Sequence, residues 1–156
     1  MLYMGEIITE ENKKALEAEL AFLNGDRQRE IIAQVQYAKS LGDLSENAEY
    51  HQAREEQAKM RERVMQIEEI LKYATVVKKT ASTGVVAVGS TVTIQKDGEE
   101  NTRVFSIVGS EETDMLAGKI SYKSPIGTAL MGKRTGDTIE VQTPKGAMSY
   151  VIKSVQ

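Results

Sequence analysis

The sequence predicts an α+β protein, in which an N-terminal antiparallel helical hairpin precedes a small β-sheet domain with one short helix. Apolar residues recur at helical spacing as far as about residue 75, and beyond residue 78 they form short alternating runs. Nine of the 12 glycines and both prolines lie after residue 83, as turns between short strands require. We therefore divide the chain into a coiled-coil hairpin over 1–77, a linker over 78–84 and a sheet domain over 85–156.

The first helical segment begins after Thr9, a suitable N-cap residue that is followed by two glutamates. Its periodic apolar positions continue beyond Gly25 and fade near Gly42. These positions are Leu16, Leu20, Leu23, Ile32, Val35 and Ala38. The spacing predicts the first arm of the hairpin.

The second helical segment begins near Ser45 and carries a seam at alternating three- and four-residue steps, which is typical of a coiled coil. The seam consists of Ala53, Gln57, Met60, Val64, Ile67, Leu71 and Ala74. Only about three residues are left to connect the two arms, so the arms must run antiparallel. With roughly 30 residues in each arm and a rise of about 1.5 Å per residue, the hairpin reaches on the order of 45 Å, and its turn is its far end.

The C-terminal part predicts a small twisted sheet. Its alternating apolar positions are Val92 and Ile94, Phe105 and Ile107, Ile139 and Val141, and Met148, Tyr150 and Ile152. Ser124 as N-cap and Pro125 as first residue predict one short helix that ends near Gly132. The residues around Lys145 and Gly146 predict a hairpin turn.

Composition excludes several kinds of site. The chain has no cysteine and a single histidine, His51, so thiolate chemistry and cysteine or histidine metal clusters are excluded. The net charge is −3, and neither half is basic enough for a duplex-binding module. The N-terminal residues lack the pattern of a signal peptide and no apolar run is long enough to span a bilayer, so we expect a cytoplasmic protein.

The hairpin turn carries three carboxylates, those of Asp43, Glu46 and Glu49. In the commoner interpretation, Asp43 and Glu46 form a capping box at the start of the second helix, and Glu49 offsets the positive helix end. Alternatively, two acids three residues apart lie about 5 to 6 Å from each other on one helical face, an arrangement that suits a hard cation such as Mg²⁺. Because an exposed pair supplies only part of a metal site, the rest must then come from a partner. The two interpretations are compatible.

Longer motifs carry a resemblance to a known family. The sequence is similar to the bacterial Gre transcript-cleavage factors over essentially the whole chain, and the acidic turn followed by Asn-Ala-Glu-Tyr is a specific signature of that family. The motifs are GDLSENAEYHQAREEQ at 42–57, RVMQIEEILKYATVV at 63–77, SPIGTALMGKRTGD at 124–137 and VQTPKGAMSYVIKSV at 141–155.

The resemblance implies that the sheet domain has a fold like that of the FK506-binding proteins and that the protein binds RNA polymerase at its secondary channel. The sheet domain would hold the channel rim, and the hairpin would extend toward the catalytic centre. There Asp43 and Glu46, assisted by Ser45, would help the polymerase to cleave the 3′ end of backtracked RNA by stabilising its second Mg²⁺ and the attacking water. The implied Mg²⁺ belongs to the polymerase. We expect no metal or cofactor in the free protein, no membrane partner, and a monomer.

Three further residues near the tip are candidate contacts with the polymerase or the RNA. Leu44 and Tyr50 are close to the acids, although Tyr50 suits the last layer of the hairpin seam equally well. Arg54 matches a basic position of the family and is a candidate for contact with RNA phosphates. The alternative for Arg54 is a solvated helix residue, since one phosphate contact contributes only a small share of binding.

In the sheet domain, Ser124, Pro125 and Ile126 match the place where the family meets the rim of the polymerase. The alternative for this segment is structural, namely a capped helix start followed by a core residue.

Other functions fit the sequence less well. An autonomous hydrolase needs a concave pocket, which an exposed turn does not provide. A prolyl isomerase needs an aromatic-lined pocket, and this half of the chain has few aromatic residues and no tryptophan. A coiled-coil adaptor, or a regulator that binds polymerase without stimulating cleavage, would use the tip acids only as caps. Neutralising Asp43 and Glu46 distinguishes these alternatives.

Overall fold

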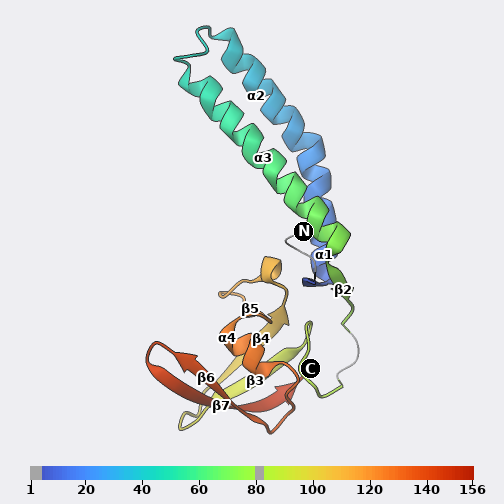
Figure 1. The fold of residues 1–156 in the computed structure, drawn as a ribbon, viewed down its shortest axis with the longest axis vertical. Helices are drawn as coiled ribbons and strands as arrows, with labels where there is room; N and C mark the ends of the chain where they lie inside the picture. The colour runs from blue at the N-terminus through green and yellow to red at the C-terminus, as the bar shows by residue number, and fades with distance from the viewer. Residues whose placement is uncertain (1–4, 80–82) are drawn as a thin grey trace. The chain divides into compact units, whose positions relative to one another are not determined.

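The computed structural model describes residues 5–79 and 83–156, and these residues form two compact units (Figure 1). Among the described residues, the first unit is Lys14–Tyr73, and the second consists of Gly5–Lys13 together with Ala74–Gln156. A short N-terminal segment thus groups with the C-terminal unit, which the sequence did not indicate. Part of the predicted linker, 80–82, lies outside the described residues.

The hairpin arms follow the predicted periodicity. The first arm consists of α1 (Glu10–Phe22), a π-helical turn η1 (Leu23–Arg27) and α2 (Gln28–Ser40), and the second arm is α3 (Ala48–Tyr73). Figure 1 shows α2 and α3 running side by side. The Thr9 hydroxyl accepts a hydrogen bond of 3.1 Å from the backbone N–H of Asn12, which confirms the predicted N-cap of α1.

The face of α2 that is buried differs by one position from the predicted one. Ile31 is 1% exposed, whereas Ile32, which the sequence analysis placed in the seam, is 42% exposed. Ile31 precedes Val35 and Ala38 by four and seven residues, close to one and two turns of about 3.6 residues, so these three side chains share one face of α2. Ile32 precedes them by three and six residues and lies beside that face. The prediction for Ile32 was therefore wrong.

The hairpin is held together by a narrow apolar seam. Ile31 and Val35 of the first arm pack with Ala53 and Met60 of α3, and Leu23 and Tyr50 cover this cluster. Further along α3, Ile67 and Ile70 are also buried. Ile67 was predicted, but Ile70 was missed because the strict alternation of four- and three-residue steps assigned the next seam position to Leu71. Val64 and Leu71, also predicted, are only half-buried.

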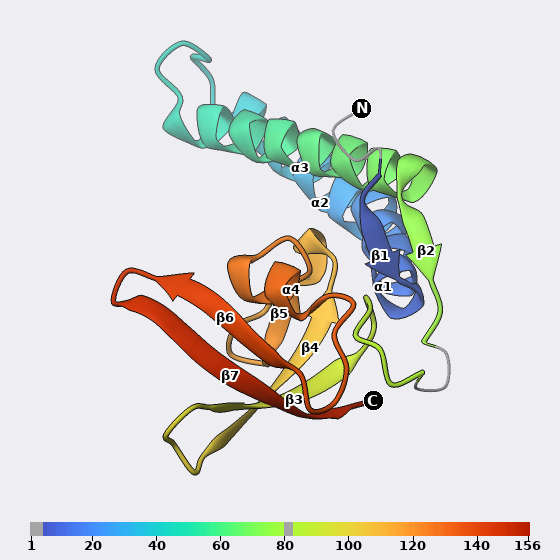
Figure 2. The same ribbon diagram turned by 60° about the horizontal axis from the view of Figure 1, so that its bottom comes forward.

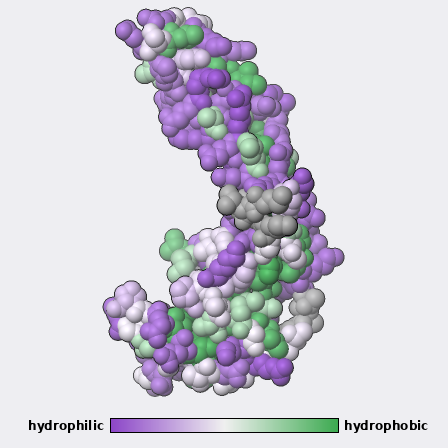
Figure 3. Space-filling view, viewed as in Figure 1, coloured by the Kyte–Doolittle hydropathy of each residue, from purple (hydrophilic) through white to green (hydrophobic). Residues whose placement is uncertain are grey.

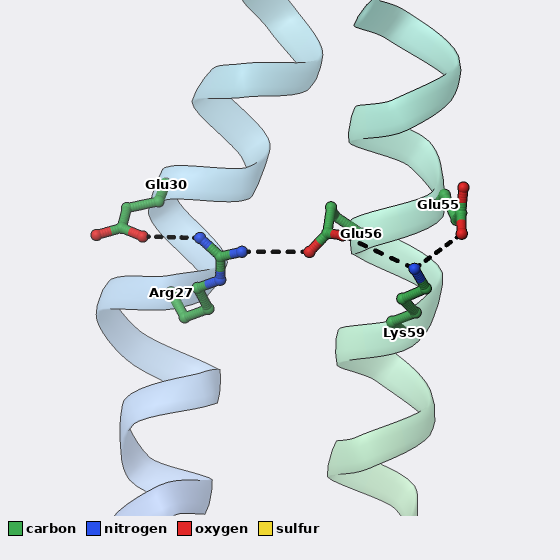
Figure 4. Close-up of polar contacts among 5 residues, drawn as sticks. All are labelled: Arg27, Glu30, Glu55, Glu56 and Lys59. Atoms are coloured by element: carbon green, nitrogen blue, oxygen red, sulfur yellow. Dashed lines mark hydrogen bonds and ion pairs between the residues drawn. The ribbon is translucent and has the colours of Figure 1, made fainter.

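Polar contacts connect the arms beside the seam. The Arg27 guanidinium lies 3.1 Å from Glu30 on its own arm and 3.4 Å from Glu56 on α3 (Figure 4). Lys59 pairs with Glu55 at 2.8 Å on α3. On its visible face the hairpin is mostly hydrophilic, as Figure 3 shows. The paired side chains are between 30% and 66% exposed, so solvent screens the pairs and each stabilises the hairpin only weakly.

The second unit contains a five-stranded mixed sheet in the order β5-β4-β3-β7-β6, in which only β4 and β5 are parallel. Its strands are β3 (Thr91–Lys96), β4 (Thr102–Val108), β5 (Lys119–Ser121), β6 (Thr138–Thr143) and β7 (Gly146–Val155). A short 3₁₀ turn, η2 (Ser110–Glu112), precedes β5, and the helix α4 (Pro125–Leu130) follows it. The predicted α+β class is confirmed.

The core of this unit comes from the predicted alternating positions. The buried members that were predicted are Val92, Ile94, Ile107, Ile139, Val141, Tyr150 and Ile152, and α4 adds Leu130. Strands β6 and β7 pair from Thr138 to Gly146, with a tight turn at the predicted place.

A second, two-stranded sheet was not predicted. β1 (Ile7–Thr9) and β2 (Thr75–Val77) pair in parallel, although more than 60 residues separate them in the chain (Figure 2). Each strand has three residues, which is too short for a recognisable alternation. In the described parts of the chain, no helix combines the length and the apolar character needed to cross a membrane.

Candidate functional site: the hairpin tip and the start of α4

The connection between the arms is longer than predicted. Helix α2 ends at Ser40 and α3 begins at Ala48, so residues 41–47 form the tip. The second helix therefore does not start near Ser45, and the short three-residue turn was a wrong prediction. Gly42 adopts a φ of +94°, a left-handed conformation that glycine allows where the chain leaves a helix.

Asn47 is the residue that closes this tip. Its side-chain oxygen accepts a hydrogen bond of 3.0 Å from the N–H of Tyr50, so Asn47 caps α3. Its side-chain nitrogen donates to the carbonyl oxygens of Ala38 at 2.6 Å and Gly42 at 3.1 Å. One amide group thus bonds to backbone groups at the end of one helix and at the start of the next. This role of Asn47 was not predicted, although asparagine directly before a helical segment is itself a capping signal.

Asp43 and Glu46 do not form the predicted capping box, because Asn47 occupies the capping position. The Asp43 carboxylate accepts a hydrogen bond of 2.8 Å from the Ser45 hydroxyl, and the Glu46 N–H donates to the Asp43 carbonyl at 3.3 Å. No hydrogen bond or ion pair joins the Glu46 carboxylate to any residue that the structure describes. Both acids are exposed. Glu49 lies in the first turn of α3, where its charge favours the helix start, as predicted.

The neighbours of the acids differ in how firmly they are held. Leu44 is 43% exposed at the tip. Tyr50 packs on the apolar cluster of the seam and meets the His51 ring edge-on, with the ring centroids 5.7 Å apart. The His51 ring nitrogen lies 3.3 Å from the Ser45 carbonyl. Arg54 is exposed and donates to the Gln57 side chain at 2.6 Å.

The tip offers carboxylates but not a complete metal site. An open depression is lined by Leu41, Gly42, Asp43, Glu46, Asn47, Ala48 and Glu49. Within the described residues there is no group of three or more metal-binding side chains. Mg²⁺ prefers about six oxygen ligands, several of them water or phosphate, so two exposed carboxylates fit as a minority of its shell.

The second predicted site, Ser124, Pro125 and Ile126, forms the start of α4. The Ser124 hydroxyl accepts a hydrogen bond of 3.0 Å from the Gly127 N–H and donates to the Ser121 carbonyl at 2.7 Å. The predicted N-cap is confirmed, and Pro125 is the first residue of the helix and is exposed. Ile126 is half-buried and packs against the sheet core, so part of its surface has a structural role.

A close backbone approach fixes this helix start. A Cβ atom at Gly127 would lie 2.0 Å from the Ser121 carbonyl oxygen, so only glycine fits at this position. Ser121 also accepts, through its hydroxyl, a hydrogen bond of 3.1 Å from the Lys123 N–H.

The fold and the site together define the protein as one of two units with an acidic helical hairpin. The hairpin presents exposed carboxylates at its turn, and the mixed-sheet unit presents a capped, exposed helix start.

Comparison with known sequences identifies the family. The family described as "Transcription elongation factor, N-terminal" matches residues 6–76, and the one described as "Transcription elongation factor, GreA/GreB, C-term" matches residues 81–156. The chain belongs to the GreA/GreB family of transcription elongation factors, as the sequence motifs predicted.

Two curated relatives agree with this assignment. The chain is 44% identical over 150 residues to the transcription elongation factor GreA of Streptococcus pneumoniae and 45% identical to that of Streptococcus sanguinis, covering 96% of this chain and 94% of each relative. Among solved structures, the GreA factor homolog 1 protein of Thermus thermophilus is 25% identical, with 97% of this chain and 99% of that chain covered and a TM-score of 0.44.

Proposed function

We propose that this elongation factor binds RNA polymerase at the secondary channel and stimulates the polymerase's own cleavage of backtracked RNA, with Asp43 and Glu46 as the residues that act on the reaction. The observation that carries the proposal is that these two acids are exposed at the tip while Asn47 caps the helix. Acids that are not needed as caps are available as ligands for a partner.

The chemistry follows from the donor set. Mg²⁺ bound in the polymerase would supply the activation of a water molecule for attack on the RNA phosphodiester. Asp43 and Glu46 add carboxylate oxygens beside that centre and orient the water by accepting hydrogen bonds from it. The Ser45 hydroxyl, 2.8 Å from the Asp43 carboxylate, restricts the rotation of that side chain and so holds it in one orientation. The factor is therefore an accessory protein that needs no cofactor of its own, and it acts as a monomer in the cytoplasm.

The flanking residues divide into contacts at the tip and contacts on the sheet unit. Leu44 is exposed for contact with the channel wall, and the Arg54 guanidinium is exposed for contact with a phosphate of the RNA 3′ end. Tyr50 contributes mainly by packing on the seam, with its remaining surface facing the partner. Ser124, Pro125 and Ile126 contact the rim of the channel, where Pro125 offers an exposed and rigid surface.

The test is RNA cleavage by a purified, stalled and backtracked polymerase complex. The wild type is compared with Asp43→Asn combined with Glu46→Gln, which keeps the shape of both side chains and removes both charges. We expect the double variant to lower the cleavage rate about 100-fold or more, because it removes ligands from a metal-assisted reaction. Polymerase binding, measured by competition with labelled wild type, should stay within about twofold.

A matched control removes two charges elsewhere on the same hairpin. Glu62→Gln combined with Glu68→Gln changes two exposed glutamates of α3 that lie away from the tip, and it should cleave like the wild type. If the wild type binds polymerase but cleavage is the same with and without it, the proposal is wrong. The protein would then be a polymerase-binding regulator without cleavage-stimulating activity.

A further inference from the structure

Glu6 stands apart from the other acids of the protein because it is buried. It is 5% exposed, and no other charged residue of the described parts of the chain is buried. Its backbone is fixed as well, since the Glu6 carbonyl accepts a hydrogen bond of 2.8 Å from Thr75 as the pairing of β1 with β2 begins. A buried carboxylate is unfavourable unless its oxygens are paired, so the partners of Glu6 show what it holds.

Each oxygen of Glu6 has a partner in a different loop of the same unit. One oxygen accepts a hydrogen bond of 3.1 Å from the backbone N–H of Ser110, and the other forms an ion pair with the Lys123 ammonium. Burial by itself raises the pKa of Glu6, but the Lys123 and Ser110 contacts outweigh it and hold the pKa below its ordinary value. Glu6 is therefore ionised at neutral pH.

The two loops approach each other at Ser121, the last residue of β5, three residues before the N-cap of α4. The hydroxyl groups of Ser110 and Ser121 lie 3.3 Å apart, and the Ser121 hydroxyl accepts from the Lys123 N–H. The Ser121 carbonyl in turn receives hydrogen bonds from the N–H and the hydroxyl of Ser124. The chain of contacts thus runs from Glu6 through Lys123 and Ser110 to the N-cap of α4.

Stability alone is a weak explanation for this arrangement. The Lys123 side chain stays 55% exposed, so solvent screens the pair, and an apolar residue at position 6 would avoid the desolvation of a carboxylate. The pair instead constrains the backbone before α4. It connects Lys123, the residue that precedes Ser124, to Glu6 next to β1, and so restricts the path of the chain as it enters the helix.

We propose that Glu6 is a positioning residue for the polymerase-contact segment 124–126, which it holds in its binding conformation through Lys123 and Ser110. This inference rests on the proposed function, because the segment matters only if it contacts polymerase. Glu6 itself touches neither the polymerase nor the RNA in this proposal.

The test separates binding from chemistry by titrating the factor into the backtracked complex. Glu6→Gln keeps an acceptor for Ser110 and removes the ion pair. We expect it to raise the half-maximal factor concentration about fivefold and to leave the cleavage rate at saturation unchanged. Glu99→Gln is the control, because it removes an ion pair of 2.6 Å with Lys96 that lies on the surface of the same unit. It should change neither quantity.

Two further measurements show whether Glu6 acts through Lys123. In a Lys123→Met background, Glu6→Gln should cause no further rise in the half-maximal concentration, because the ion pair is already absent and the change only neutralises a buried carboxylate that has lost its partner. Amide hydrogen exchange at Gly127 and Thr128 should become about tenfold faster in Glu6→Gln and stay unchanged in Glu99→Gln.

Failure of the inference and failure of the proposed function give different results. If the wild type neither binds polymerase nor stimulates cleavage, the proposed function fails. If the wild type does both and Glu6→Gln has the wild-type half-maximal concentration, the inference is overturned, even if Glu6→Gln unfolds at a lower temperature. The inference is also overturned if Glu6→Gln raises the half-maximal concentration as much in the Lys123→Met background as in the wild type.

Discussion

The hairpin tip and the start of α4 both begin a helix after a turn, but their side chains differ in how many contacts they make. In both, a turn leads into a helix, and a polar side chain caps the helix: Asn47 at the tip and Ser124 at α4. At the tip, the two acids beside the cap are exposed and make few contacts. At α4, the residues around the cap are bonded to other loops, and the backbone passes so close to Ser121 that position 127 must be glycine.

This difference separates residues that we expect to act on the reaction from residues that hold the fold. Where side chains have no structural contacts, replacing them changes function without changing stability. Where they are bonded on several sides, any replacement affects folding first. The four changes below test this contrast through the free energy of unfolding, from the largest expected loss to the smallest.

Gly127→Ala should cause the largest loss, about 2 to 3 kcal/mol. The added methyl group would meet the Ser121 carbonyl oxygen at 2.0 Å, and backbone cannot move aside without breaking the cap. Urea unfolding of both proteins measures the difference. Gly25→Ala is the control, because a Cβ atom there has no neighbour within 4 Å, and it should not destabilise the protein. Equal stability of Gly127→Ala and wild type would contradict the close approach.

Asn47→Ala should cost about 1 to 2 kcal/mol, the usual range for a lost N-cap. The change removes the bond to Tyr50 and the two bonds that the Asn47 side chain donates to the Ala38 and Gly42 carbonyls. Helical circular dichroism during urea unfolding reports on the hairpin. Asn24→Ala, an exposed asparagine in the first arm, should stay within about 0.5 kcal/mol of wild type. A loss of the same size at both positions would argue against the cap.

Glu6→Gln should cost about 1 kcal/mol at pH 7, with the charge-assisted bond discounted for the exposure of Lys123. The pKa of Glu6 is lowered in the folded protein, so the stabilisation is fully present above the ordinary value of 4.5 and is lost as the pH falls through the folded pKa below that value. Unfolding free energies of wild type and variant should therefore differ by a constant amount from pH 7 to about pH 5 and converge below pH 4.5. A difference in unfolding free energy that grows as the pH falls would mean that the pKa of Glu6 is raised in the folded protein, and would contradict this prediction.

Asp43→Asn combined with Glu46→Gln should have the smallest effect on stability, less than about 0.5 kcal/mol, because neither carboxylate caps α3. The same pair of changes is expected to abolish most cleavage stimulation. A stability loss near that of Asn47→Ala would mean that the acids are structural after all.

Local signals in the sequence were sufficient for most of the fold. Alternating apolar runs located the strands β3, β4, β6 and β7, and the dipeptide of Ser124 and Pro125 located α4, because caps and short-range periodicity depend on neighbours in the chain. The family motifs identified the acids, but the structure was needed to show that they are not caps.

The predictions that failed concern residues whose environment depends on contacts with residues distant in the chain. Asp43 and Asn47 both have the chemistry of a cap, and the contact from Asn47 to Ala38, nine residues away on the other arm, is possible only in the closed hairpin. Ile31 and Ile32 are neighbours with the same side chain, and the structure shows that Ile31 shares the buried face of Val35 and Ala38. Glu6 gave no signal, since its partner Lys123 lies 117 residues further along the chain.

The parallel pairing of β1 with β2 makes the hairpin an insertion in the second unit, because the chain leaves that unit after Lys13 and returns to it at Ala74. Topologically, the two arms form the crossover connection that any pair of parallel strands requires. Adding or removing one heptad in each arm would change the arm length by about 10 Å and leave the strand register untouched. The reach of the acidic tip can therefore vary during evolution independently of the unit from which the hairpin emerges.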